Sequence, residues 1–435
     1  MRKSKRFLAL LLAGTLAFAG LTGCGKKDED DSKTNNTPTP VQSDNKGSGE
    51  NITLTVWGPQ EDQAPREGYD KGILATMCES FNAAHPEWNI TFKYGVCSEA
   101  DAKAEVSKDP TAAADVYVYA NDQLSDLVAS GAIAQIGGSN LETIKSNYSQ
   151  SMVDSVTYNG GVYGVPFTPN TWFMYYNKSM FTEEDVKSLN TMMEKDLGDG
   201  IYNVAFPLTN SWYIAAFYYA AGGQLFGENG ADAAAGTNFG ELSAVTEYLV
   251  DLKANPKFSV ENNGSSIALM KEGKLGAYFT GSWDADQIRG ALGENFAATQ
   301  IPTVTINGTS GQMKSFAGSK AIGVNANSKN MQAAVALAMY LGSEECQKIR
   351  FATRGITPTC LSLSDDPAVV ADEVSYAQTL EIINASVVQP MIPEMQNFWT
   401  PAETMGKEID QGDVTKANAA EKTKNMGNAI MSSGL

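Results

Sequence analysis

Strand-type and helix-type segments alternate at the start of the body of this 435-residue chain, and this order restricts its fold more than any single motif. Residues 52–57 (ITLTVW) have the alternating pattern of a half-buried strand, and residues 72–84 have a helical pattern. Further strand-type runs follow at 89–94 and 114–119, and a second helical pattern at 122–130. Strands that alternate with helices at this spacing predict an α/β fold in which mainly parallel sheets are flanked by helices.

The N-terminal segment has the order of parts found in an export signal. A basic patch comes first, made of Arg2, Lys3, Lys5 and Arg6. The apolar run at 7–18 is too short for a mature membrane span, so residues 1–23 are predicted to be a signal peptide. The tetrad Leu-Thr-Gly-Cys at 21–24 resembles the lipobox of bacterial lipoproteins, which implies lipidation of Cys24 and anchoring outside the cytoplasm at the cell membrane. A single N-terminal anchor helix is the alternative.

Residues 24–50 are predicted to be a disordered linker behind the lipid-bearing cysteine. After Cys24 they contain no aromatic residue and a single aliphatic side chain, Val41. Such a segment buries too little apolar surface to offset the entropy lost on ordering. As a flexible coil it reaches roughly 25–30 Å.

The charge of the chain restricts its partners. Residues 1–23 hold four of the 32 basic residues and none of the 50 acidic ones, so the rest carries 28 basic against 50 acidic residues, a net charge of −22. A body this acidic repels phosphate backbones, so no nucleic-acid partner is expected. No apolar run after residue 18 approaches the length of a membrane span.

Four cysteines remain in the body after Cys24. They form two couples that are close in sequence, Cys78 with Cys97 and Cys346 with Cys360. In an exported chain, local pairing into two disulfides is the simplest prediction, and four buried free thiols are the alternative. His85 is the only histidine, and the cysteine spacings do not fit zinc, so neither a metal site nor a cofactor is expected.

Four blocks of sequence occur in the order typical of one protein family. They are ADVYVYANDQL (114–124), YNGGVYGVPFTPNTWFMYYNK (158–178), KEGKLGAYFTGSW (271–283) and PMIPEMQNFW (390–399). From about residue 52 onward the chain resembles the maltose-binding protein and its relatives, the solute-binding components of ABC importers. The resemblance implies a binding protein without catalytic activity, monomeric, that delivers its solute to the importer's permease subunits.

The resemblance also implies a two-lobed periplasmic-binding-protein-like fold. The family's crossover points assign 51–168 plus 317–369 to the N-terminal lobe, and 169–316 plus 370–435 to the C-terminal lobe. A hinge between the lobes is expected to close over ligand held in the cleft.

The chemistry of a sugar predicts what such a cleft contains. A pyranose has apolar C–H faces and polar edges, so it requires flat aromatic platforms and fixed hydrogen-bonding groups. The aromatic positions that match the family's sugar-stacking residues are Tyr119, Trp212, Trp283 and Trp399. Each stands at the end of a predicted strand or beside a polar turn. Trp172 stays undecided because it lies next to the expected hinge.

Three polar residues are predicted to contact ligand by the same resemblance: Asp122, Glu61 and Asn170. Asp122 matches a ligand-contacting aspartate of the family, although it could instead cap the helix that follows. The chain also departs from the maltose pattern. Gln123 replaces an arginine, Asn170 and Asn210 stand where the family has carboxylates, and Glu61-Asp62 lacks the family's lysine. These changes keep the family's aromatic residues and alter its polar ones. An oligosaccharide therefore remains the expected ligand, and it need not be maltose itself.

Two other functions compete with sugar binding. A polyamine or other small solute could occupy the same fold, and the acidic charge favours a cation. A secreted carbohydrate-active enzyme would need two carboxylates about 5–10 Å apart at the cleft. The resemblance places asparagines there, which disfavours an enzyme. The prediction is therefore an extracytoplasmic lipoprotein that captures a sugar, such as a malto-oligosaccharide.

Lipid anchoring through Cys24 can be tested by Cys24→Ala. Without the lipid-accepting thiol, we expect the protein to be released into the medium or to stay as an uncleaved precursor. Cell fractionation with mass determination of the N-terminus gives the result. A Cys24→Ala product that is processed normally and remains membrane-bound would contradict the anchor.

Overall fold

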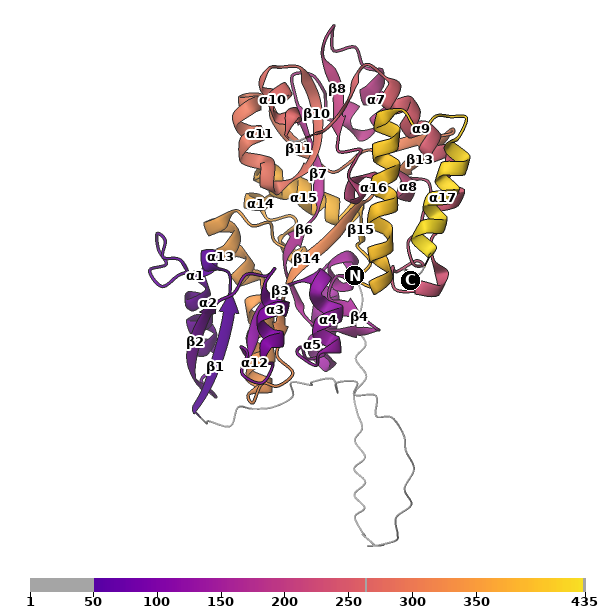
Figure 1. Cartoon of the computed structure of the whole chain (residues 1–435). Coiled ribbons are helices and arrows are strands. Elements are labelled where there is room, and N and C mark those ends of the chain that lie inside the picture. Colours follow the sequence, from indigo (N-terminus) through magenta and orange to yellow (C-terminus); the bar gives the residue numbers. More distant parts are fainter. Residues whose placement is uncertain (1–50, 263, 433–435) are drawn as a thin grey trace, which may run out of the picture. The chain divides into compact units, whose positions relative to one another are not determined.

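The computed structural model describes residues 51–262 and 264–432. The predicted signal peptide, Cys24 and the predicted linker lie outside the described residues. Two large sheets organise the described chain (Figure 1). The first has the order β15-β14-β3-β1-β2, with β6 also paired to β14. Its strands are β1 (Asn51–Gly58), β2 (Asn89–Val96), β3 (Val116–Ala120), β6 (Val165–Asn170), β14 (Ser315–Val324) and β15 (Ser386–Val388).

The second sheet has the order β11-β7-β10-β8-β9. Its strands are β7 (Trp172–Asn177), β8 (Tyr202–Phe206), β9 (Phe258–Val260), β10 (Leu275–Gly281) and β11 (Phe296–Thr299). Two small antiparallel pairs complete the strands, β4 (Thr157–Tyr158) with β5 (Gly161–Val162) and β12 (Thr303–Ile306) with β13 (Thr309–Gln312). The α/β class is confirmed.

The prediction of mainly parallel sheets is too simple, because both sheets are mixed. In the first sheet β3, β1 and β2 run parallel, whereas β14 runs antiparallel to both β3 and β6. In the second sheet β10, β8 and β9 run parallel, whereas β7 runs antiparallel to β10 and β11. The antiparallel strands β7 and β14 lie next to the segments that pass from one sheet to the other. No complete βαβ unit, the connection that makes neighbouring strands parallel, precedes either of them.

The helices flank the sheets. Those of the first half of the chain are α1 (Gln60–Gln63), α2 (Ile73–Ala84), α3 (Ala102–Lys108), α4 (Leu124–Ala129), α5 (Gly138–Asn147), α6 (Gln150–Asp154), α7 (Leu189–Glu194) and α8 (Ser211–Ala220). Those of the second half are α9 (Ser243–Ala254), α10 (Ser265–Lys271), α11 (Ala285–Leu292), α12 (Met331–Leu341), α13 (Glu344–Arg354), α14 (Pro367–Ala371), α15 (Glu373–Asn384), α16 (Gln396–Gln411) and α17 (Ala419–Met431). None of the helices in the described part of the chain combines the length and apolarity needed to span a bilayer.

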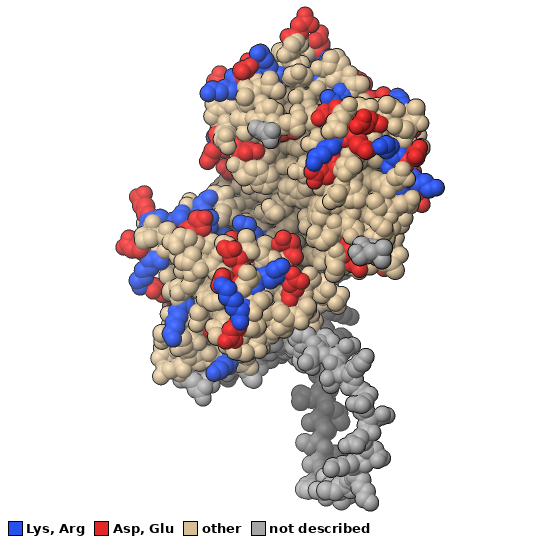
Figure 2. Space-filling view, viewed as in Figure 1, with Lys and Arg blue, Asp and Glu red and all other residues tan. Residues whose placement is uncertain are grey.

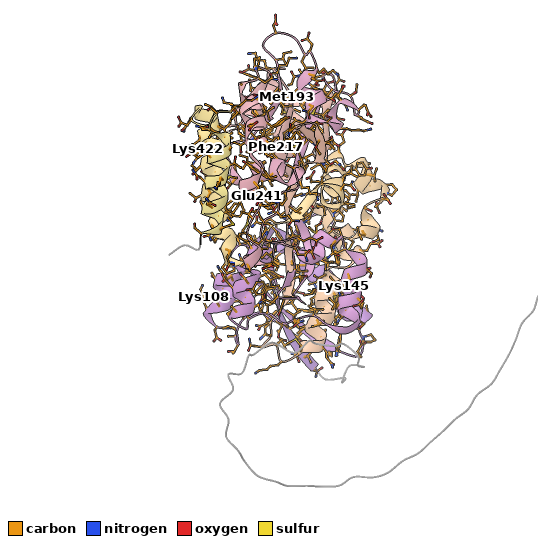
Figure 3. All side chains as sticks on the ribbon, turned by 90° about the vertical axis from the view of Figure 1, so that its right-hand side faces the viewer. Lys108, Lys145, Met193, Phe217, Glu241 and Lys422 are labelled. Carbon is orange, nitrogen blue, oxygen red and sulfur yellow. The ribbon has the colours of Figure 1, made fainter. Side chains whose placement is uncertain are left out.

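Separate apolar cores form around the two sheets. The first draws on residues from Leu54 to Phe167, then from Ala317 to Leu363, with Ile382. The core of the second sheet draws on residues between 172 and 316 and again between 374 and 430. Phe217 on α8 points into this second core, whereas Lys422 on α17 stands at the surface (Figure 3). The lobe boundaries at 168/169, 316/317 and 369/370 stay a prediction.

The predicted disulfides are wrong, because all four cysteines are free and buried. Cys97 Sγ donates to the Ser98 carbonyl and Cys360 Sγ to the Gly342 carbonyl, while Cys78 and Cys346 lie inside the first core. Burial raises the pKa of each thiol, so all four are held in the unreactive protonated form. Proximity in sequence sets the length of a loop, but a disulfide also needs Cβ atoms that face each other.

A buried hydrogen-bonded chain joins three segments between the two sheets. Glu381 Oε1 lies 2.6 Å from Ser315 Oγ, which lies 2.7 Å from Thr171 Oγ1, and Thr171 Oγ1 lies 2.9 Å from the Phe316 carbonyl. These three contacts need three protons, and the two hydroxyls supply only two. A protonated Glu381 supplies the third. Burial raises the pKa of Glu381 from 4.5 to about 8, which agrees with a neutral carboxyl at pH 7.

The Glu381→Gln variant tests this buried carboxyl. The folded-state pKa lies above the unfolded one, so the stability that Glu381 contributes is complete below about pH 4.5 and is lost as the pH rises towards 8. The glutamine amide stays neutral, donates to Ser315 and accepts from Ile301 N–H, which lies 2.8 Å from Glu381 Oε2. As the pH rises from 4.5 to 8, the wild type should therefore lose stability that the variant keeps. The free energy of unfolding of the variant minus that of the wild type should increase by on the order of 5 kcal/mol. Urea unfolding at several pH values measures the difference, and a constant difference would contradict the assignment.

Candidate functional site

Two adjoining cavities collect the polar and aromatic residues that point to a binding site. The smaller, about 190 Å³, is lined among others by Asp122, Asn170, Trp212, Lys320 and Gln389. The larger, about 540 Å³, shares Asp122 and Gln389 and adds further residues including Trp399. Figure 2 shows a recess whose walls are mostly uncharged, whereas acidic and basic side chains are interspersed over the surfaces on either side. Both sheets contribute, because Trp212 belongs to the second core and Lys320 lies on a strand of the first sheet.

Trp212 is positioned by the start of α8. Asn210 is the N-cap residue, and its Oδ1 accepts a hydrogen bond of 2.9 Å from Trp212 N–H. This cap fixes the first turn and holds the half-buried indole at the cavity wall. Asn210 therefore has a structural role at this turn.

Trp283 extends the same wall. It lies in the short 3₁₀ helix Ser282–Asp284 directly after β10, and its ring centroid is 6.0 Å from that of Trp212. The side chain is 52% exposed, which is unusual for a tryptophan and leaves a large apolar face open to a ligand. Gly281 makes this placement possible, because a Cβ at that position would collide with the Trp283 ring.

Trp399 lies on the wall of the larger cavity. It sits in the first turn of α16, half-buried, and packs edge-on against Phe316 at 6.0 Å and Phe398 at 5.2 Å. Phe316 belongs to β14, so this aromatic group connects α16 to the strand that carries Lys320. Trp399 thus combines a packing role with a position at the cavity.

Polar side chains with unused hydrogen-bonding capacity face the aromatic wall. Asp122 is exposed in the 3₁₀ helix Asn121–Gln123 and caps no helix, so the capping alternative is not realised. Asn170 is exposed at the end of β6. The side chains of Asp122, Asn170 and Gln389 make no hydrogen bond to another residue in the described ranges. The structure therefore brings Asp122, Asn170, Trp212, Trp283 and Trp399 to one region.

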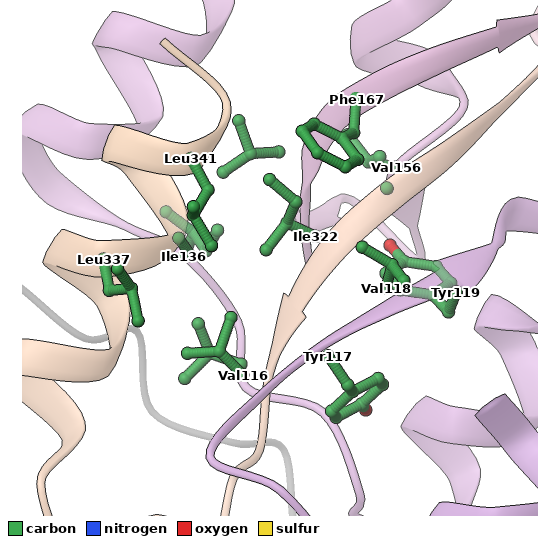
Figure 4. Packing of buried hydrophobic residues seen from close by; sticks show 14 of the residues in the cluster. Val116, Tyr117, Val118, Tyr119, Ile136, Val156, Phe167, Ile322, Leu337 and Leu341 are labelled. Atoms are coloured by element: carbon green, nitrogen blue, oxygen red, sulfur yellow. The ribbon is translucent and has the colours of Figure 1, made fainter. Parts of the chain in front are cut away.

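Tyr119 is not a platform, and that prediction is wrong. Its side chain is 0% exposed and lies in the first core beside β14 (Figure 4). β3 is a central strand, paired with β1 on one side and β14 on the other, and both of its faces are covered. Tyr119 Oη has no hydrogen-bond partner among the described residues, and burial raises the pKa of this phenol.

Glu61 and Gln123 also lie differently from the expectation. Glu61 is exposed in α1 and lines neither cavity, while its carbonyl accepts from Arg66 at 2.7 Å. The neighbouring Asp62 is buried in ion pairs with Arg350 and Arg354. Gln123 lines the larger cavity, but its amide is occupied by backbone partners, including Ala100 O at 2.6 Å. The undecided Trp172 is a fully buried core residue.

Sequence reasoning missed Lys320 and Gln389. Lys320 lies on β14, and its Nζ is 3.6 Å from Glu99 Oε1. Gln389 directly follows β15, and its backbone N–H donates to Ala317 O. Nothing in the local sequence around either residue indicates a cavity, because only the pairing of β14 with β15 and β3 brings them there. Within the described ranges, no group of three or more metal-ligating side chains is arranged to hold a metal ion.

Comparison with known proteins agrees with this arrangement. Residues 76–376 match the family described as bacterial extracellular solute-binding protein, and the chain belongs to this family. Its members bind solutes and are not enzymes.

Two characterised relatives align over nearly the whole chain. The galactooligosaccharide-binding protein of Bacillus subtilis is 27% identical over 97% of this chain and 96% of its own length. A maltooligosaccharide ABC transporter solute-binding lipoprotein of Streptococcus pneumoniae serotype 4 is 25% identical over 93% and 92%.

Solved structures share the two-lobed fold. One, described as a complex with acarbose, is 46% identical over 87% of this chain and 98% of its own, with a TM-score of 0.70. The maltodextrin binding protein MalE1 from L. casei BL23 without ligand is 26% identical over 88% and 99%, with a TM-score of 0.76. The predicted family and the two-lobed fold are confirmed.

Proposed function

We propose that this protein captures an oligosaccharide between its two lobes and delivers it to an ABC importer. The observation that carries the proposal is Trp212, with Trp283 beside it, in a cavity that also holds the side chains of Asp122, Asn170 and Gln389. These three side chains make no hydrogen bond to another described residue. The indole faces suit the C–H faces of a pyranose, and the amides and carboxylate suit its hydroxyl groups.

The relatives support the same ligand class. Their names specify galactooligosaccharide and maltooligosaccharide, and a 46% identical protein was solved with acarbose. These ligands share a chain of linked six-membered rings that carry hydroxyl groups, which is the feature that the aromatic wall and polar side chains would recognise.

Export and anchoring complete the proposal. The family is extracellular, and a relative is named a lipoprotein. Lipidation of Cys24 would hold the protein at the outer face of the cell membrane, within reach of the permease subunits. Closure of the lobes on ligand would mark the loaded state for the permease.

A polyamine is the second candidate, and Lys320 weighs against it. Polyamine recognition pairs aromatic faces with carboxylates that have no competing cation. Here the ammonium of Lys320 lies in the same small cavity as Asp122. A positively charged ligand would be repelled at that point.

Titration calorimetry on the described body tests the proposal with maltotriose, maltotetraose, a galacto-oligosaccharide, acarbose and spermidine. A disaccharide of about 23 heavy atoms at about 0.3 kcal/mol per atom binds with about 7 kcal/mol, a dissociation constant of order ten micromolar. At least one of the sugars should reach this affinity. Binding of spermidine alone would overturn the ligand class and leave the fold intact.

Trp283→Ala is the sharpest variant of this test. Its side chain is 52% exposed, so truncation should leave the unfolding midpoint nearly unchanged. Loss of the stacked face should weaken sugar binding by about 1–3 kcal/mol, or roughly ten- to a hundredfold. The matched control is Trp88→Ala, which removes an indole packed against Phe81 in the first core. That variant should lose stability and keep sugar affinity, and the opposite pattern would place the site elsewhere.

A further inference from the structure

Lys320 occupies a position where the first sheet is irregular. It lies on β14 with Ala120 of β3 and Thr168 of β6 as its neighbours across the sheet. The register between β14 and β6 shifts directly after it, between Lys320 and Ala321. Such irregularities redirect a side chain from its regular place, and they are frequent beside functional sites. Here the residue that borders the shift lines the smaller cavity.

The ammonium of Lys320 has one ionic partner and free donors. Its Nζ is 3.6 Å from Glu99 Oε1, which is beyond hydrogen-bond distance, and its side chain is 42% exposed. It makes no hydrogen bond to any other residue that the structure describes. Glu99 is 8% exposed and is held by its backbone, because its carbonyl accepts from Ala120 N–H and from Gln123 Nε2, both at 3.1 Å. Glu99 therefore holds the ammonium of Lys320 at the cavity and leaves the hydrogen-bond donors of Lys320 free.

The charges around the cavity give Lys320 a defined role. Asp122 contributes one carboxylate to the cavity, and Glu99 contributes a second behind Lys320. Arg350 also interacts electrostatically with Glu99, but it is fully buried and engaged with Asp62 and the Phe167 carbonyl. Lys103, which lines the adjoining larger cavity, is already paired with Asp126 at 2.8 Å. Without Lys320, the smaller cavity would place an aromatic wall beside two carboxylates and would be lined by no cation of its own. That combination suits an organic amine.

We propose that Lys320 is the specificity-determining residue that makes this cavity accept a neutral sugar and reject an organic amine. Its ammonium donates to a hydroxyl or ring oxygen of the sugar next to the ring stacked on Trp212, and its charge repels a protonated amine. Glu99 is a positioning residue that acts through Lys320. This inference rests on the proposed function, and Lys320 is not among the residues predicted from the sequence.

The test compares Lys320→Met with the wild type by calorimetry, using maltotriose and spermidine as the two probes. Loss of a charged donor should weaken maltotriose binding roughly ten- to a hundredfold. Spermidine binding should increase by at least a similar factor, so the ratio of the two affinities inverts. Lys320→Arg keeps the charge and should preserve the wild-type preference. The control is Lys329→Met, which removes an exposed lysine five residues after the end of β14 and should change neither affinity.

Glu99→Gln separates positioning from charge. It should weaken maltotriose binding less than Lys320→Met, because the ammonium remains but is no longer held, and it should not introduce spermidine binding. Thermal unfolding of each variant verifies the fold, and Lys320→Gln replaces the methionine variant if that one does not fold.

The outcomes distinguish this inference from the proposed function. A wild type that binds maltotriose, together with a folded Lys320→Met variant of unchanged preference, would overturn the role of Lys320 and leave the sugar function standing. A wild type that binds spermidine and none of the sugars would overturn both.

Discussion

The hydrogen-bonded chain from Glu381 through Ser315 to Thr171 is the interaction on which the site depends most. Each of its three members lies on a segment that also carries a polar residue of the smaller cavity. Asn170 directly precedes Thr171, Lys320 lies five residues after Ser315 on the same strand, and Gln389 lies eight residues after Glu381. A buried polar network that is fully satisfied fixes the segments that supply its members. Here it sets the positions of the hydrogen-bonding groups relative to one another.

Aromatic and polar groups divide the recognition of a ligand between the two halves of the structure. The second sheet and its helices supply the tryptophan wall, through the ends of β10 and the start of α8. The first sheet supplies Asp122, Asn170 and Lys320. A ligand that satisfies both sets must contact both lobes at once, and its binding energy then becomes available to stabilise their closure.

The sequence predicted that Trp212 and Trp283 are at least partly exposed, as the structure shows, and it failed on features that depend on pairing between distant segments. Trp212 and Trp283 follow polar turns or strand ends, and these local patterns indicate exposure wherever the strand lies in a sheet. Tyr119 has the same local pattern, but β14 pairs with β3 and covers it, and β14 comes almost two hundred residues later. Lys320 could not be found for the same reason, since its partner Glu99 lies in a different part of the chain. The disulfide prediction failed because all four cysteines pack into the first core as free thiols, and closeness in sequence does not reveal whether two side chains face each other.

The central claim is that one sugar contacts both lobes, and small-angle X-ray scattering measures its consequence directly. The purified body, with and without a saturating concentration of the sugar that calorimetry identifies, should show a smaller radius of gyration when loaded. The Trp283→Ala variant at the same sugar concentration should show a smaller decrease, because fewer molecules are loaded. An unchanged radius of gyration at proven saturation would contradict the account, since it would mean that ligand binds without drawing the two lobes together.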